Sequence, residues 1–422
     1  MTAKPNEAAP GQMASVEPLL KSLPRLAYVG DVPVEASYHG SALLYRLMAD
    51  YPTGQLTIVE AGLERSKVER RIENAIYLSE PVPCSRLNST RFHLEYEALR
   101  IVTARFLGRR LADRLKPFKP EAIVTVSHGV SWIAAAHAAR ILDVPFHLIC
   151  HDEWAKLPSK IIGQSSREEL FGRTYRAAHS RLCVSPFMEE NYGRRFGETG
   201  TVLYPSRDKL EPSQDGPQAR AAKTGDGLIC TFAGSINSPG YVGALTRVAD
   251  ELAKIRGQLE IFGPVDAEAG ARAGLNKPNI RFRGMVPSAQ LIETLRRESD
   301  ILYVPMSFEA RDRLNMELSF PSKLTDYTLT GLPLLISGPD YCSAVQWAEK
   351  YEGVAECVTE VEGNGLAEAL RRLTDPAHRL RVGRRAAEIG EELFSYERAI
   401  ATFYRALQKS PLFVEASLDN EA

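Results

Sequence analysis

Short apolar runs alternate with helical patterns twice along this chain, and this alternation limits the folds open to it. In the first half the runs lie at residues 25–30, 55–62, 122–129, 146–150, 181–185 and 200–205. Helical patterns separate several of them, for example at 131–143. Strands that alternate with helices form a parallel sheet covered by helices on its faces. The first half is therefore predicted to be a doubly wound α/β domain.

The second half repeats this plan. Its apolar runs lie at residues 227–234, 259–264, 280–284, 301–305, 332–338 and 354–359. A chain of 422 residues with 44% hydrophobic residues can bury two cores, so we expect two domains. The predicted segments are a disordered tail (1–22), a first domain (23–205), a polar linker (206–227), a second domain (228–390), a helical segment (391–409) and a tail (410–422).

Composition and charge exclude several classes of protein. Charged residues make up 25% of the chain, but the net charge is only −1, which argues against a nucleic-acid binder. The six cysteines lie mostly in apolar runs without paired spacing, so buried free thiols are expected. Residues 1–22 lack the apolar core of a signal peptide, and no run approaches a spanning helix. We therefore expect a cytoplasmic protein with at most peripheral membrane contact.

The segment 319–339 places a helix start, a lysine and a carboxylate together. Ser319 or Ser322 can cap this helix. Lys323 and Asp326 are three residues apart, so they project from the same side of its first turn. Unpaired backbone N–H groups and the helix dipole favour an anion there, and a diphosphate would fit. An ordinary surface helix with a Lys/Asp pair is the alternative.

This segment, following a strand and helix alternation, resembles the donor site of retaining nucleotide-sugar glycosyltransferases of the GT-B fold, the group called family four. In that family a Glu before a G-x-P turn holds the ribose hydroxyls. Asp326 matches it, with Asp in place of Glu, and Lys323 matches the phosphate-binding lysine of a subgroup that carries P-S-K, here with Ser322. The resemblance implies two Rossmann-like domains and a last helix (391–409) that crosses back to the first domain.

The family motif has an earlier Glu, eight residues before the first, that approaches the donor sugar. A literal search for this spacing finds Glu309 and Glu317. The G-x-P turn instead fixes the register at position 318 and Asp326, and position 318 is Leu318. In this register the sugar-facing acid is missing.

The resemblance assigns further donor contacts to two turns. Gly40 and Ser41 open a helix after the first strand, where glycine and N–H groups allow a phosphate to approach. Gly284, Met285 and Val286 match a segment whose backbone frames the nucleotide base. Backbone and apolar contacts do not identify the base, so uridine, guanosine and adenosine donors all remain open.

A turn in the second half also matches a phosphate-binding position of the family. Gly234 and Ser235 follow the strand 227–234. The family's basic residue and Lys-Gly pair are absent after this turn. Neutralisation of the phosphates must then rest more heavily on Lys323, with Arg311 or Arg313 as helpers; the alternative for both arginines is simple solvation.

The acceptor side is predicted from residues that follow strands of the first half. His151 comes directly after the run 146–150, so it should lie at a carboxyl strand end, where doubly wound domains place working residues. A family histidine in the matching place contacts the donor sugar and phosphate. Asp152 and Glu153 are candidates to orient the acceptor hydroxyl, and His128 could line the acceptor cleft. The alternative for each histidine is a structural role.

Basic residues crowd one helical segment at 100–119 that also carries apolar side chains. They are Arg100, Arg105, Arg109, Arg110, Arg114, Lys116 and Lys119. A basic amphipathic helix can lie on an anionic membrane. A core-facing helix with a solvated basic face is the alternative.

The function predicted from the sequence is sugar transfer from a nucleotide diphosphate donor to a hydroxyl acceptor, in polysaccharide, glycolipid or glycosylated-metabolite synthesis. We expect a retaining enzyme without a cofactor or metal ion, since the chain has no Asp-x-Asp pair. His151, Lys323 and Asp326 are the expected catalytic residues. Two alternatives remain: a nucleotide-sugar epimerase or hydrolase of this fold, and a catalytically silent nucleotide- or glycan-binding module. The oligomeric state is not indicated.

Overall fold

The computed structural model describes residues 17–37, 39–154, 162–209, 227–236 and 238–408. The first part forms a sheet of seven parallel strands in the order β3-β2-β1-β4-β5-β6-β7. These strands are β1 (Leu26–Gly30), β2 (Leu56–Glu60), β3 (Ile76–Ser79), β4 (Ala122–Val126), β5 (Phe146–Cys150), β6 (Ser180–Cys183) and β7 (Thr201–Val202). The strands β1, β2, β4 and β5 are buried along their whole length, as expected for a parallel sheet covered on both faces.

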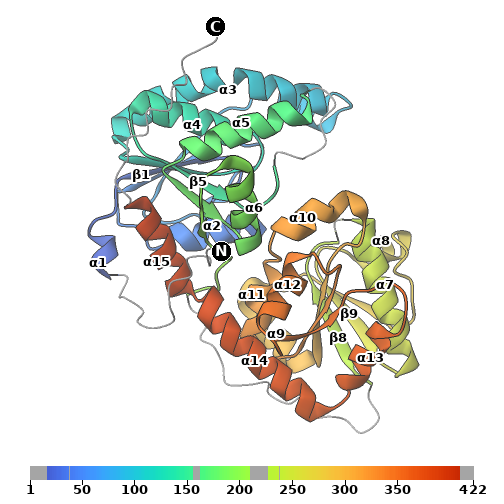
Figure 1. The fold of residues 1–422 in the computed structure, drawn as a ribbon. Helices are drawn as coiled ribbons and strands as arrows, with labels where there is room; N and C mark the ends of the chain where they lie inside the picture. Colours follow the sequence, from blue (N-terminus) through green and yellow to red (C-terminus); the bar gives the residue numbers. More distant parts are fainter. Residues whose placement is uncertain (1–16, 38, 155–161, 210–226, 237, 409–422) are drawn as a thin grey trace.

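Helices surround this first sheet (Figure 1). They are α2 (His39–Met48), α3 (His93–Leu115), α4 (Ser131–Leu142), α5 (Gln164–Ala177) and α6 (Pro186–Phe196), with 3₁₀ turns η1 (Val68–Arg70), η2 (Ser85–Ser89) and η3 (Lys116–Phe118). The longest of them, α3, packs along α4 through small residues: a Cβ added at Gly108 would lie 2.9 Å from the carbonyl oxygen of Ala134. The two helices therefore approach closely at this point.

The second part of the chain repeats the plan with six parallel strands in the order β10-β9-β8-β11-β12-β13. They are β8 (Ile229–Ala233), β9 (Gln258–Phe262), β10 (Ile280–Gly284), β11 (Ile301–Pro305), β12 (Leu334–Ser337) and β13 (Ala355–Val358). The helices are α7 (Pro239–Lys254), α8 (Ala267–Arg272), α9 (Ser288–Glu298), α10 (Arg313–Leu318), α11 (Lys323–Leu329), α12 (Ser343–Lys350), α13 (Gly365–Arg372) and α14 (Pro376–Phe394), with the 3₁₀ turn η4 (Ala310–Asp312). The predicted doubly wound plan of both halves is confirmed.

The last helix, α15 (Tyr396–Leu407), leaves the second sheet and returns to the first (Figure 1). It packs against α2 and β6, and its buried Ile400 and Phe403 join a core with Leu44 of α2. The preceding helix α14 stays on the second unit, where it packs against α11. The crossing back of the C-terminal helix, which the resemblance implied, is therefore present.

An aromatic cluster holds the two units together where the first sheet ends. Tyr204, two residues after β7, lies with its ring centroid 5.0 Å from that of Phe320 and 5.4 Å from that of Phe394. The next residues are also buried: the Arg207 guanidinium donates to Thr328 Oγ1 at 3.3 Å and pairs with Glu391. The start of the predicted linker is thus packed into the junction, whereas most of it, residues 210–226, lies outside the described residues.

Three details differ from the sequence-based expectations. Residues Glu17–Leu20, expected in a disordered tail, form the short helix α1, which packs against α15. The strand β3 was not predicted, because as a half-exposed edge strand it lacks a continuous apolar run. Gly40 and Ser41 were expected to open the helix after the first strand, but α2 already begins at His39.

Two further expectations concern cysteines and membranes. The structure records all six cysteines as free thiols, and Cys84 is the exposed one, in agreement with the expectation that most are buried. None of the helices in the described ranges is long and apolar enough to cross a membrane.

Candidate active site

Lys323, the first residue of α11, reaches the carboxyl end of the central strand β8. Its Nζ lies 5.0 Å from the ring centroid of Phe232 and 5.7 Å from that of Tyr241. A Cβ added at Gly234 would lie 3.3 Å from Lys323 Cε and 3.5 Å from Nζ. In the described part of the chain, Lys323 forms no ion pair with a carboxylate. The amine is therefore held between two aromatic rings at the turn after β8, without a compensating negative charge.

Burial in this slot lowers the pKa of Lys323 to about 8. The cause is desolvation, which disfavours the charged form of a lysine. An anion bound beside Nζ would restore the charge and would gain from the low local dielectric. The site is thus better matched to an anionic ligand than to water.

This pKa predicts a pH dependence of anion binding. The amine is charged below about pH 8 and becomes neutral as the pH rises through that value, so the Kd for a nucleoside diphosphate should rise above pH 8. Calorimetric titrations between about pH 7 and pH 10 would measure it. In Lys323→Arg, whose guanidinium stays charged, the Kd should not rise in this range. A wild-type Kd that is constant across it would contradict the assignment of Lys323.

The turn between β8 and α7 has the form of an anion site. Gly234 adopts a φ of 148°, which favours glycine, and its N–H donates to the Phe262 carbonyl at 2.9 Å. Ser238 is the N-cap residue of the 16-residue helix α7, yet its side chain forms no capping bond. The Ser238 hydroxyl is buried and has no hydrogen-bond partner within the described chain. We had not selected Ser238 from the sequence; the signal was its position directly before Pro239, a frequent first helical residue.

Glycines continue along the same edge of the second sheet, toward the predicted base site. A Cβ at Gly263, after β9, would lie 2.3 Å from the Gly234 carbonyl oxygen, and the Gly263 N–H donates to the Gly284 carbonyl at 2.9 Å. Gly284 itself has a φ of 71°. Met285 is 51% exposed, whereas Val286 packs against the core. Backbone turns and one exposed apolar side chain therefore lie in line with the turn at Gly234.

Asp326 does not pair with Lys323, although both belong to the first turn of α11. Burial raises the pKa of Asp326, and the nearby guanidinium groups of Arg46 and Arg207 lower it. Arg46 belongs to α2 of the first unit; it donates to the Ser206 carbonyl at 2.5 Å. Lys323 thus points to β8, while Asp326 faces the junction of the two units.

The cap of α11 also differs from the expectation. Ser322 occupies the N-cap position, but its exposed side chain makes no capping hydrogen bond. Ser319 Oγ instead lies 2.6 Å from Asn315 Oδ1 and 3.2 Å from Asp152 Oδ1. The Asp152 contact joins the two units beside the expected acceptor side.

The exposure and contacts of Leu318, Glu317 and Glu309 show which of these three positions could present an acid to the donor sugar. Leu318 is only 1% exposed, and its carbonyl accepts a hydrogen bond from Ser185 Oγ at 2.6 Å. Glu317 is half-buried and lies near Tyr341, whose pKa its charge helps to raise. Glu309 is exposed, and its Cγ lies 3.3 Å from where a Cβ of Gly240 would be, in the first turn of α7. Of the three residues, Glu309 is the one placed at the anion site.

His151 and His128 follow adjacent strands, β5 and β4, and lie close together. Burial, opposed by the charge of Asp152 and reinforced by that of His128, lowers the pKa of His151 to about 4. The Nε2 atom of His151 is buried without a hydrogen-bond partner in the described structure. His128 and Asp152 are exposed. His151 is therefore neutral at pH 7, with one ring nitrogen unused.

Glu153 is not retained as an acceptor-side candidate. Its carboxylate is 5% exposed and takes both guanidinium nitrogens of Arg195, at 2.9 Å and 3.3 Å. A carboxylate held in this way inside the first unit is not accessible to an acceptor hydroxyl. The sequence gave no sign of this partner, because Arg195 lies on α6, forty-two residues away.

The remaining predicted residues are less informative. Gly40 and Ser41 lie half-buried in the first turn of α2, and a Cβ at Gly40 would meet only Val32, at 3.6 Å. Ser235 is half-buried in the turn after β8.

The two arginines named as possible helpers of Lys323 are both exposed. Arg313 packs over the ring of Tyr341, with its Cζ 4.2 Å from the centroid. Arg311 belongs to the 3₁₀ turn η4. Within the part of the chain that the structure describes, Lys323 shares no ion-pair partner with either arginine.

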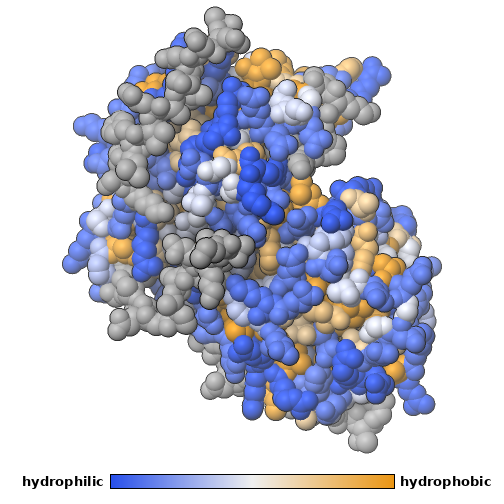
Figure 2. Space-filling view, in the orientation of Figure 1, coloured by the Kyte–Doolittle hydropathy of each residue, from blue (hydrophilic) through white to orange (hydrophobic). Residues whose placement is uncertain are grey.

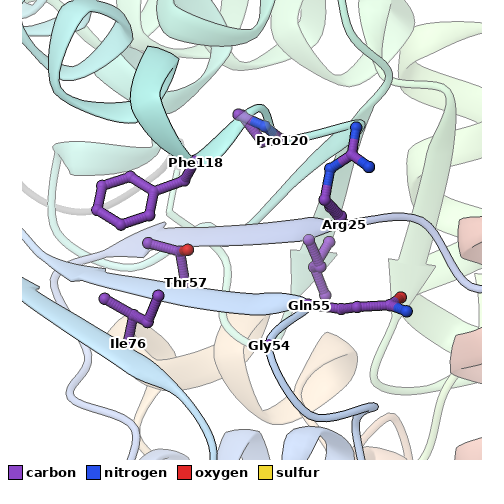
Figure 3. A pocket seen from close by; sticks show the side chains of 8 residues that line it. Arg25, Gly54, Gln55, Thr57, Ile76, Phe118 and Pro120 are labelled. Atoms are coloured by element: carbon purple, nitrogen blue, oxygen red, sulfur yellow. The ribbon is translucent and has the colours of Figure 1, made fainter.

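A small hollow occurs at the opposite edge of the first sheet. Arg25, Gln55 and Phe118 line it, near the amino ends of β1, β2 and β3 (Figure 3). Doubly wound sheets bind ligands at the carboxyl ends of their strands, so we do not assign this hollow to catalysis. Within the described ranges, no group of three His, Cys, Asp or Glu side chains could hold a metal ion.

Comparison with known proteins agrees with this geometry. Residues 76–208 match the profile of Glycosyltransferase Family 4. Among solved structures, HepE of Anabaena bound to UDP and glucose is 14% identical with a TM-score of 0.62, covering 91% of this chain and 99% of its own. Sucrose-phosphate synthase of Thermosynechococcus elongatus is 17% identical with a TM-score of 0.62, covering 90% and 98%. The trehalose-6-phosphate synthase of Burkholderia multivorans is 15% identical with a TM-score of 0.63, covering 92% and 96%.

The search of curated proteins found no match. The structural neighbours show that the chain has the GT-B fold, with its two parallel sheets and flanking helices. Together with the family profile, they support sugar transfer from a nucleotide donor.

Proposed function

We propose that this protein is a retaining glycosyltransferase that moves a sugar from a nucleoside diphosphate donor to a hydroxyl acceptor. The observation that carries the proposal is the amine of Lys323, held at the glycine turn before α7 without a carboxylate partner among the described residues. The Family 4 match over residues 76–208 and the structural neighbour that contains UDP and glucose agree with it.

The donor diphosphate would bind at the start of α7. Lys323 supplies the positive charge, the Ser238 hydroxyl supplies an unused hydrogen-bond donor, and Gly234 lets the backbone approach. The N-terminal end of a long helix favours negative charge at the same place. The base would then lie along the edge that leads to Gly284 and the exposed Met285.

Two acidic residues, Asp326 and Glu309, would each bind one of the two sugars of the donor. Asp326 is proposed to hold the ribose hydroxyls, as the resemblance implies, and Arg46 and Arg207 favour its charged form. Glu309, next to Gly240, is proposed to hold the hydroxyls of the transferred sugar, in place of the buried Leu318. A carboxylate suits both tasks because its oxygens can accept from neighbouring hydroxyls.

Bond breaking leaves negative charge on the nucleoside diphosphate. Lys323 and the start of α7 would stabilise this charge in the leaving group directly, in the way that fixed donors stabilise developing anions. The neutral His151 can donate one ring N–H to the sugar or phosphate without first losing a proton near pH 7. The exposed His128 and Asp152 would border the acceptor hydroxyl, whose proton can pass to the leaving phosphate.

A thermal-shift series tests the donor assignment. Nucleoside diphosphates and their sugars bind the folded state, so the matching base should raise the Tm, whereas the corresponding nucleoside should not. Incubation of the matching donor sugar with hydroxyl acceptors should then yield a product of unchanged anomeric configuration, with and without EDTA. No stabilisation by any nucleoside diphosphate would refute the proposal. Free sugar or an epimer without acceptor would favour the hydrolase or epimerase, and binding without turnover would favour the silent module.

A further inference from the structure

One face of α3 carries apolar side chains that are open to solvent. Leu99 is 54% exposed, Val102 68% and Phe106 58%. These residues lie at positions i, i+3 and i+7, so they form one stripe along the helix. The adjoining turn η2 and the residues after it add Leu87, 36% exposed, and Phe92, 45% exposed. Figure 2 shows hydrophobic surface at the top of the first unit, where α3 runs in Figure 1. We call these five residues the α3 stripe.

Exposed arginines border the α3 stripe and are not neutralised by the fold. They are Arg86, Arg91, Arg105 and Arg109, and none of them forms an ion pair with a described carboxylate. The Cζ atoms of Arg91 and Arg105 each lie 4.8 Å from the ring centroids of Phe92 and Phe106. Glu95 and Asp113 are exposed acids of the same helix, and Asp113 is paired with Lys116.

The other basic residues of the helix have structural partners. Arg110 and Arg114 pair with the buried Glu80, and Lys116 pairs with Asp113 at 2.7 Å. The arginines of α3 that lack a described carboxylate partner, Arg105 and Arg109, therefore lie beside the α3 stripe, while Lys119, expected in the same basic surface, is exposed beyond the end of the helix.

We propose that the α3 stripe docks on an anionic lipid bilayer. A convex helix face offers no pocket to a peptide, but it can sink its apolar side chains among acyl chains. Unpaired arginines beside it attract acidic headgroups, while their stems cover apolar surface. Charge complementarity thus selects the membrane from the partners that an apolar stripe could have.

The α3 stripe lies close to the proposed acceptor side of the active site. Arg100, next to Leu99, donates to Asp31 at 2.8 Å, and Asp31 accepts from the backbone N–H groups of Val130 at 2.9 Å and Ser131 at 2.6 Å. Arg100 therefore lies at the carboxyl edge of the first sheet. Val130, which contacts the same aspartate, is two residues from His128. A bilayer on the α3 stripe would border the acceptor side, so we infer that the acceptor hydroxyl belongs to a lipid. This last clause rests on the proposed function.

Vesicle co-sedimentation of the full chain tests the docking. Wild type should sediment with vesicles of phosphatidylcholine and phosphatidylglycerol, and much less with phosphatidylcholine alone. Val102→Glu/Phe106→Glu and Arg105→Ala/Arg109→Ala should each weaken binding about tenfold or more. Val361→Glu is the matched control, because Val361 is 46% exposed in the second unit, outside the α3 stripe; it should bind like wild type.

The outcomes separate this proposal from the donor site. Absence of wild-type binding to the anionic vesicles, or unchanged binding of the Val102→Glu/Phe106→Glu variant, would overturn the docking. A wild-type dimer that this variant converts to a monomer would show that a second copy covers the α3 stripe, and would also overturn it. A retained Tm shift with the nucleoside diphosphate shows that each variant is folded. Because sedimentation needs no nucleotide, vesicle binding without any donor binding would leave the docking intact and would refute the proposed function together with the inference about the acceptor.

Discussion

Lys323→Met is expected to lower the rate of sugar transfer by about 100-fold or more, on the scale of losing one donor that stabilises a developing anion. The methionine can still fill the slot between Phe232 and Tyr241, so the variant removes the charge and keeps the packing. The Tm shift produced by a nucleoside diphosphate should shrink with the rate. Initial rates and thermal shifts at about pH 7 measure both effects.

The same substitution should not lower the thermal stability of the protein without ligand. Because the pKa of Lys323 is lowered from its ordinary value to about 8, the unfolded chain binds the proton more tightly than the folded chain does. The charged amine therefore costs free energy of folding below about pH 8, and this cost falls as the pH rises toward the unfolded value. Lys323→Met should keep or raise the Tm of the unliganded protein at pH 7.

Lys254→Ala supplies the control. Lys254 lies at the far end of α7, exposed and paired with Glu251 at 2.7 Å, so its loss should change neither transfer nor the ligand-induced shift. Transfer by Lys323→Met at the wild-type rate would remove this lysine from the site. A lowered Tm without ligand would show that the amine serves the fold instead.

Periodicity predicted the fold well because both sheets consist of buried parallel strands. Such strands appear as short continuous apolar runs, and the helices between them have a different period. The edge strand β3 was not predicted, because its side chains are half-buried or exposed and form no continuous apolar run. Helix α1 (Glu17–Leu20) was missed for a related reason: Leu19 and Leu20 pack against the core around α15, a contact between segments far apart in the chain.

The site was predicted in part, because spacing along a helix does not fix what each side chain meets. Lys323 and Asp326 share one turn, yet one points to β8 and the other meets Arg46 of the other unit. Glu153 follows His151 by two residues, but its partner Arg195 comes from a distant helix. Residues at strand ends were identified correctly as lying at the carboxyl edge, whereas partners supplied by other helices depend on packing that no local pattern encodes.

The largest effect expected outside Lys323 concerns the choice between Glu309 and Glu317. Glu309→Gln should lower kcat by about 100-fold, because a carboxylate that accepts from sugar hydroxyls contributes most when they gain charge in the transition state. The Kd for the nucleoside diphosphate, which carries no sugar, should stay unchanged. Steady-state rates with the donor identified by thermal shift, and calorimetry with the diphosphate, separate the two quantities.

Glu309 lies in the loop after β11, close to the first turn of α7. Ser307 Oγ donates to Asp312 Oδ2 at 2.6 Å and accepts from the Glu309 N–H at 3.2 Å, so hydrogen bonds within the loop after β11 hold its backbone in place. A Cβ at Gly240 would lie 2.3 Å from Ser307 Oγ, which shows how close this approach is. The Glu309 side chain is exposed and lies beside this turn, so we expect its carboxylate to reach a sugar bound next to the proposed diphosphate position.

Glu317→Gln is the matched control for this substitution, since Glu317 is eight residues further along and lies near Tyr341 rather than near α7. It should transfer sugar at a rate close to that of wild type. If Glu317→Gln loses activity and Glu309→Gln does not, the sugar is held from α10, and the loop after β11 only supports the fold. If neither loses activity, no acid of this segment touches the sugar, and the buried Leu318 marks a real loss of that contact rather than a shift of it to Glu309.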